Sequence, residues 1–148
     1  MTETAPTSPS GTSLWNPNAA SVWSILFTPV FGAWLHALNW RALGDPERER
    51  ASMAWVYGGL ALLALDLIID SVVPDHAGFA VERTIEAAYL VAWYFRSARP
   101  QATLVKEKYG ASFEHKSWRQ PLLMALAGLG IYILLTIAIA AVIGLRYL

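Results

Sequence analysis

The sequence predicts an all-α membrane protein, a bundle of about four helices with a short additional helix on the cytoplasmic surface. Of its 148 residues, 55% are hydrophobic, and its mean hydropathy is +0.39, which is ordinary for a chain that crosses a membrane several times. Several apolar stretches are long enough to span a bilayer. Several of the seven Trp and six Tyr residues lie near the ends of these stretches, where amphipathic rings favour the membrane–water interface.

The chain is organised around residues 53–73, MAWVYGGLALLALDLIIDSVV. This stretch contains no Lys or Arg and has two acids, Asp66 and Asp70. A helix rises about 1.5 Å per residue, so this one can cross a hydrocarbon core of roughly 30 Å. The two acids are four residues apart and therefore share one helix face. An ionisable group at membrane depth costs at least a few kcal/mol, so it is usually paired, in contact with water, or functional.

The N-terminal residues 1–13 are rich in Thr, Ser and Pro and contain no Lys or Arg. This composition predicts a disordered tail. Because the tail has no basic segment, a cleaved signal peptide is not expected. Residues 14–148 are expected to form one transmembrane helical domain.

The first apolar segment, residues 21–40, is long enough to span but carries Pro29 and Gly32 near its centre. Proline removes a backbone hydrogen bond and bends a helix. Two interpretations remain open. The favoured one is a kinked spanning helix, and the other is a re-entrant hairpin that turns at Pro29 and exits where it entered. We expect His36 and Asn39, near the end of the segment, to satisfy hydrogen bonds rather than to bind a ligand.

A third helix is predicted over residues 79–98, after a short turn at residues 74–78. Residues 99–120 are polar and basic, and we expect part of this segment to form an amphipathic helix on the membrane surface that breaks at Gly110. Because the segment lies beside two spans, anionic lipid headgroups are the expected partner of its charges and nucleic acid is not. These charges are Arg96, Arg99, Lys106, Lys108, Lys116 and Arg119.

The last helix is predicted over residues 122–145, which carry no charge. Small or polar residues recur there every four positions, and small residues at that spacing let helices approach closely in lipid. We interpret this face as a helix-packing face rather than a transport path. Its members are Gly128, Tyr132, Thr136, Ala140 and Gly144.

The orientation follows from the distribution of Lys and Arg. The loop after residue 40 and the segment of residues 96–120 carry nine of these residues, whereas the tail and the turn at residues 74–78 carry none. The positive-inside rule therefore places both basic loops in the cytoplasm. With four crossings both termini face outward, and with a re-entrant first segment the N-terminus is cytoplasmic.

The acids of the second and third helices are predicted to form an intramembrane polar cluster. If the turn centres on His76, Asp70 lies level with Glu82, and Asp66 lies level with Glu86. With Arg83 nearby, such a cluster cannot be fully ionised, because repulsion and desolvation both raise carboxylate pKa values. A structural network is the favoured interpretation. The alternatives are a proton or cation path and, less favoured, a divalent-metal site that includes His76.

Two stretches carry a resemblance, WNPNAASVWSILFTPVFGAWLHALNWRALG and VKEKYGASFEHKSWRQPLL. They resemble segments of small bacterial inner-membrane proteins that have no known activity, and together they cover about a third of the chain. The resemblance implies a multi-pass protein of the bacterial inner membrane and implies no functional residue. In some relatives a small soluble module precedes the first segment, which favours a cytoplasmic N-terminus.

No catalytic motif is found: there is no GxSxG, no HExxH and no phosphate-binding glycine loop. The absence of cysteine excludes disulfides, thiolate metal sites and cysteine nucleophiles. No cofactor is expected. The first functional hypothesis is therefore a non-enzymatic protein that binds a membrane protein partner, as accessory subunits and immunity proteins do. The alternative is a proton- or cation-conducting component, which would need an oligomer because four helices without an internal repeat are too few for a transporter.

Overall fold

The computed structural model describes residues 12–72, 79–110 and 113–145, and these residues are almost entirely helical. Two of the helices, α3 (Pro46–Val72) and α6 (Arg119–Leu145), are long and apolar enough to cross a membrane. They contain the two apolar stretches at residues 53–73 and 122–145 from which spans were predicted. The expectation of a helical chain with membrane-length helices is confirmed to this extent.

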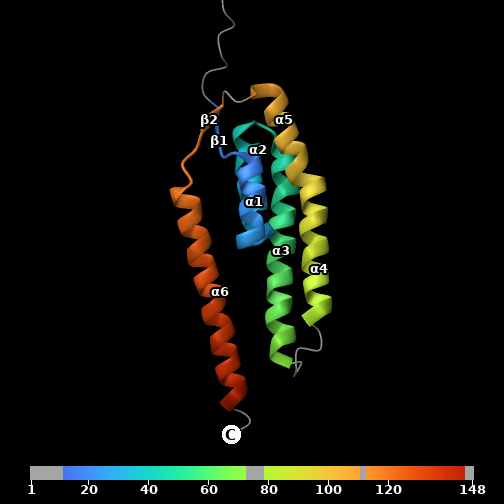
Figure 1. The fold of residues 1–148 in the computed structure, drawn as a ribbon, viewed down its shortest axis with the longest axis vertical. Helices are drawn as coiled ribbons and strands as arrows, with labels where there is room; N and C mark the ends of the chain where they lie inside the picture. The colour runs from blue at the N-terminus through green and yellow to red at the C-terminus, as the bar shows by residue number, and fades with distance from the viewer. Residues whose placement is uncertain (1–11, 73–78, 111–112, 146–148) are drawn as a thin grey trace, which may run out of the picture.

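The first apolar segment is a helical hairpin (Figure 1). Helix α1 (Pro17–Phe27) ends at Thr28, and α2 (Pro29–Ala42) runs back beside it. Thr28 has a φ of +94°, which a β-branched residue rarely adopts. The break falls there because Pro29 supplies no N–H and disfavours helical geometry in the residue before it. The interpretation as one kinked helix is therefore wrong, and the hairpin alternative describes the segment.

Contacts between residues far apart in sequence hold the two arms of the hairpin together. At the open end, the Trp15 N–H donates to Asn39 Oδ1 at 3.0 Å, and Asn39 Nδ2 donates to the Trp15 carbonyl at 2.8 Å. Near the tip, Gly32 lies against Ser24 of the opposite arm. Ala20 and Leu35 are fully buried between the arms. The hairpin is thus a packed unit rather than a bent rod.

Helix α3 begins after a tight turn at Gly44 (φ +74°) and continues well beyond the hairpin tip (Figure 1). The adjacent glycines Gly58 and Gly59 make room on α3 for its neighbours. A Cβ on Gly58 would lie 2.8 Å from the Tyr89 hydroxyl, and one on Gly59 would lie 2.6 Å from Val30. The glycine pair therefore allows α3 to contact both the hairpin and α4 (Phe79–Trp93).

Helix α4 does not end before the basic segment. It continues through a π-helical turn, η2 (Tyr94–Ala98), into α5 (Arg99–Tyr109). The Arg99 N–H donates to the Tyr94 carbonyl, and Pro100 is tolerated because it lies in the first turn of α5. The expected surface helix does end at Gly110, but the expectation of a separate helix is wrong because the π turn joins it to α4 and buries Gln101 and Val105.

A short parallel pairing joins the N-terminal segment to the segment before α6. Strand β1 (Ser13–Leu14) pairs with β2 (Glu114–His115), and the Lys116 N–H donates to the Leu14 carbonyl at 2.9 Å. Leu14 is fully buried. The sequence did not indicate this pairing. Ser13 therefore belongs to the folded part, whereas residues 1–11 lie outside the described residues and leave the predicted tail untested.

Helix α6 contacts the hairpin at its beginning and also contacts α3. Trp118, Leu122 and Ala125 pack against the hairpin. Farther along, α6 slants toward the end of α3 (Figure 1). Large apolar side chains on its other faces, such as Leu134 and Ile137, are 60% or more exposed.

Candidate functional site

The structure brings two of the predicted cluster acids together across α3 and α4. The side chains of Asp66 and Glu86 lie close to one another, and Asp66 is only 6% exposed. Arg83 pairs with Glu86 at 2.7 Å from the outer side, where its own side chain is half exposed. Glu82 is buried on the same helix. His76 and the side chain of Asp70 lie outside the described residues.

Oδ2 of Asp66 is buried without a hydrogen-bond partner within the described part of the chain. Those residues also contain no group of three or more His, Asp or Glu side chains that could hold a metal ion, so the metal interpretation gains no support from them.

Beside this pair lies a cavity of about 710 Å³, bounded by the hairpin tip, α3, α4 and α6. The hairpin reaches only part of the way along α3, which leaves this space beyond its tip, between α3 and α6 (Figure 1). Most of its lining is apolar, including Phe27, Phe31 and Trp34. Arg83 and Glu86 add the charged groups. We call this space the subhairpin cavity.

The predicted packing face of α6 borders this cavity in part. Gly128 and Tyr132 line it, and Thr136 donates to the Tyr132 carbonyl at 3.0 Å. A Cβ at Gly128 would meet no heavy atom within 4 Å, so no other helix of this chain approaches Gly128 among the described residues. Ala140 is exposed, and the surroundings of Gly144 lie outside the described part. Packing of this face against a second chain therefore stays a prediction.

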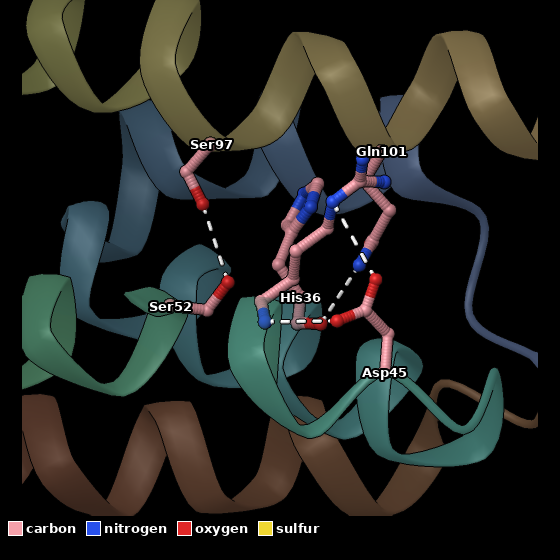
Figure 2. Close-up of polar contacts among 6 residues, drawn as sticks. His36, Asp45, Ser52, Ser97 and Gln101 are labelled. Carbon is pink, nitrogen blue, oxygen red and sulfur yellow. Dashed lines mark hydrogen bonds and ion pairs between the residues drawn. The ribbon is translucent and has the colours of Figure 1, made fainter. Parts of the chain in front are cut away.

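A separate polar layer occupies the opposite end of the bundle. Gln101 donates from Nε2 to the His36 carbonyl at 2.8 Å, and Asn39 donates from Nδ2 to Gln101 Oε1 at 3.2 Å. Ser52 and Ser97 form a buried hydroxyl pair at 3.3 Å, and Figure 2 shows it beside His36 and Gln101. The hydrogen-bonding role of Asn39 was expected from the sequence, whereas Gln101 and the two serines were missed. Their only signal is that Ser97 and Gln101 are four residues apart.

His36 does not find the ring hydrogen bonds that were expected. Its side chain is fully buried and stands edge-on to Trp93 at 5.6 Å between ring centroids. Neither ring nitrogen has a hydrogen bond of good geometry within the described residues. Burial lowers the pKa of His36 to about 4, and a contact with the Pro17 carbonyl offsets part of this effect. His36 is therefore a neutral imidazole near pH 7.

An apolar layer separates the acid pair from this polar layer. It consists of the buried residues Ala33, Val56, Trp93 and Ala98. On the cavity side of this layer, the Tyr89 hydroxyl donates to the Trp55 carbonyl, which leaves it engaged with the backbone. The described side chains therefore do not form a continuous hydrogen-bonded path between the two ends.

No protein-family model, curated protein or solved structure matches this chain. The resemblance carried by its two sequence stretches thus stays an expectation, and the function is inferred from the geometry of the chain itself.

Proposed function

We propose that this chain is a small integral protein of the bacterial inner membrane that acts without catalysis, by binding another membrane protein in the manner of an accessory or immunity protein. The observation that carries the proposal is the subhairpin cavity. In a bilayer, an apolar space of this size beside an exposed helix is filled by an apolar occupant. A transmembrane helix of a partner protein is the occupant that fits it best.

Gly128 supports a helix as the occupant. Helix association in lipid relies on small residues that let backbones approach closely, because lipid tails are as apolar as the side chains themselves. Gly128 lines the cavity, and a methyl group added to it would have no heavy atom within 4 Å. A partner backbone can therefore approach α6 here, opposite the aromatic side chains of the hairpin tip.

A matched pair of substitutions on α6 tests this proposal. Gly128 lines the cavity, whereas Gly130 does not, and a Cβ at either position is unobstructed. A photo-crosslinking residue at Leu129, which also lines the cavity, should give a discrete protein adduct in intact cells. Gly128→Leu should abolish that adduct and Gly130→Leu should preserve it. Equal adducts in both variants, or an equal adduct from Ile131, would show that the cavity does not hold the partner.

The proposed topology has three crossings, formed by α3, by α4 with η2, and by α6. The hairpin then enters and leaves from the cytoplasmic side, which places the N-terminus in the cytoplasm together with the two basic loops. Single cysteines can test this directly, because the chain has none of its own. Cysteine at Ser10 or Lys108 should be labelled only after the cell is opened, and cysteine at Asp75 should be labelled from outside. Labelling of position 108 in intact cells would refute the orientation.

The contact between Asp66 and Glu86 favours a second candidate, a proton- or cation-conducting component, because buried acids at membrane depth commonly carry protons. Asp66→Asn should then abolish function without changing expression or folding. A structural network predicts a different pattern, in which Asp66→Asn retains function while Arg83→Ala destabilises the protein. Removal of Arg83 leaves the remaining charges without compensation. The apolar layer around Trp93 makes the structural network the better-supported interpretation.

A further inference from the structure

We infer that a second cleft, between the beginnings of α3 and α5, binds the phosphate headgroup of an anionic phospholipid. This cleft has a volume of about 440 Å³, and we call it the headgroup cleft. Arg48 contributes a guanidinium from α3, Arg99 contributes one from α5, and Thr103 also lines the cleft. The inference rests on the proposed placement in a bilayer and is independent of the partner protein.

The two arginines line one cleft, and the buried hydroxyl pair holds together the helices that carry them. Ser52 of α3 and Ser97 of η2 are in contact at 3.3 Å. Arg48 lies one helical turn before Ser52, and Arg99 lies two residues after Ser97. Both guanidiniums therefore emerge beyond the buried pair, at the same end of the bundle. Guanidinium groups present a planar fork that matches the oxygens of a phosphate.

Arg48 keeps an ion pair with Asp45, whereas Arg99 has no ion pair among the described residues. The guanidinium of Arg48 lies 4.8 Å above the Trp40 ring and 3.5 Å from Asp45, and its side chain is half exposed. Arg99 lies 5.8 Å from the centre of the Phe95 ring and has no acidic partner within 4.0 Å among the described residues. The aromatic rings help to hold the guanidiniums in place. The N–H donors of Arg99, and those of Arg48 other than the Nε group near Asp45, stay available to an anion.

The position of the cleft along the bundle fits the membrane interface. The exposed aromatic residues Tyr94 and Phe95 come one turn before Arg99, as in the aromatic belts of membrane proteins. Phe95 and Leu104 line the cleft and offer contact to the upper part of an acyl chain. Glu107 also lines it but lies two turns farther along α5, so the end of the cleft nearest the membrane stays cationic.

The test compares two double variants of equal charge in the full chain. Arg48→Gln/Arg99→Gln removes the cleft arginines, and Arg50→Gln/Arg96→Gln removes two exposed arginines from the same helical segments that do not line the cleft. The preference for phosphatidylglycerol over phosphatidylcholine is measured from the lipids retained in mixed micelles by native mass spectrometry. A basic residue that contacts a bound headgroup contributes about fivefold to this preference. The first variant should therefore lose about thirtyfold, and the second, whose arginines do not line the cleft, less than about twofold.

Three results would overturn the inference. Equal losses in the two double variants would show a diffuse attraction of basic residues, and no loss in either would show that lipid does not bind the cleft. The third result uses the protein in phosphatidylcholine nanodiscs. If glycerol 3-phosphate raises its melting temperature as much as phosphatidylglycerol does, the cleft binds a soluble phosphate rather than a lipid headgroup. If the cleft variant does not fold, Arg99→Lys keeps the charge, and its preference should still fall because the fork is lost. If the wild-type protein is soluble without detergent, the proposed placement of the chain in a bilayer is wrong as well.

Discussion

Gly32 is the position at which a single methyl group should damage the hairpin most. It lies on α2, where the two arms and α4 meet. A Cβ there would collide with the Ser24 hydroxyl and would lie 2.6 Å and 2.9 Å from the Cη2 and Cζ2 atoms of Trp93. Ser24 is 1% exposed and Trp93 is fully buried. Neither side chain can move aside without disturbing the core, so Gly32→Ala should destabilise the protein.

The expected size of the effect follows from two opposing terms. Overpacking a well-filled core costs about 1–3 kcal/mol, and contact with two buried side chains places Gly32→Ala near the upper value. Replacing glycine by alanine inside a helix returns about 0.5–1 kcal/mol. The net loss is therefore about 2 kcal/mol. For a chain of this length, that corresponds to a melting temperature lower by about 4–8 °C.

The measurement is thermal unfolding of the purified protein in one detergent, with Gly130→Ala as the matched control. Gly130 also lies in a helix, but a Cβ there meets nothing within 4 Å. The control should therefore melt at or slightly above the wild-type temperature. The double variant Ser24→Ala/Gly32→Ala should recover part of the loss, because it removes the hydroxyl collision and leaves the contacts with Trp93. Equal melting of Gly32→Ala and Gly130→Ala would refute the close packing of the hairpin on α4.

Three further predictions concern the same hairpin. Because burial lowers the pKa of His36 to about 4, the unfolded chain binds a proton between pH 6.5 and 4 that the folded chain does not. Wild-type stability should therefore fall by about 3 kcal/mol more than that of His36→Gln as the pH is lowered through this window, and parallel urea-unfolding profiles would contradict this. Thr28→Gly should raise the free energy of unfolding by about 1 kcal/mol in urea, since glycine adopts the φ of +94° without a steric penalty. A lower urea midpoint than that of the wild type would show that the threonine side chain stabilises the turn. Asn39→Ala should lower the free energy of unfolding by about 2–3 kcal/mol, because it removes three hydrogen bonds and leaves the Trp15 backbone and Gln101 without these partners. A loss below about 1 kcal/mol would indicate that water replaces the amide.

The sequence alone determined the features that depend on local pattern. The absence of Lys and Arg from residues 53–73, and of any charge from residues 122–145, is enough to predict two membrane-length helices. The sequence also predicts that Asp66 and Glu86 lie at the same depth, because an antiparallel hairpin with a short turn brings residues of equal separation from that turn to the same level. Helical periodicity and chain length set both results, and neither requires knowledge of the remaining helices.

Only the tertiary structure decided how the first segment folds. Pro29 and Gly32 are compatible with a kink and with a hairpin, since both conformations interrupt the helix at the proline. The hairpin is selected by contacts between distant residues, such as Asn39 with Trp15 and Gly32 with Trp93. The subhairpin cavity, the headgroup cleft and the burial of Gln101 follow from that choice. They depend on which faces of separate helices meet, and a pattern along one helix contains no information about the surface that its neighbour presents.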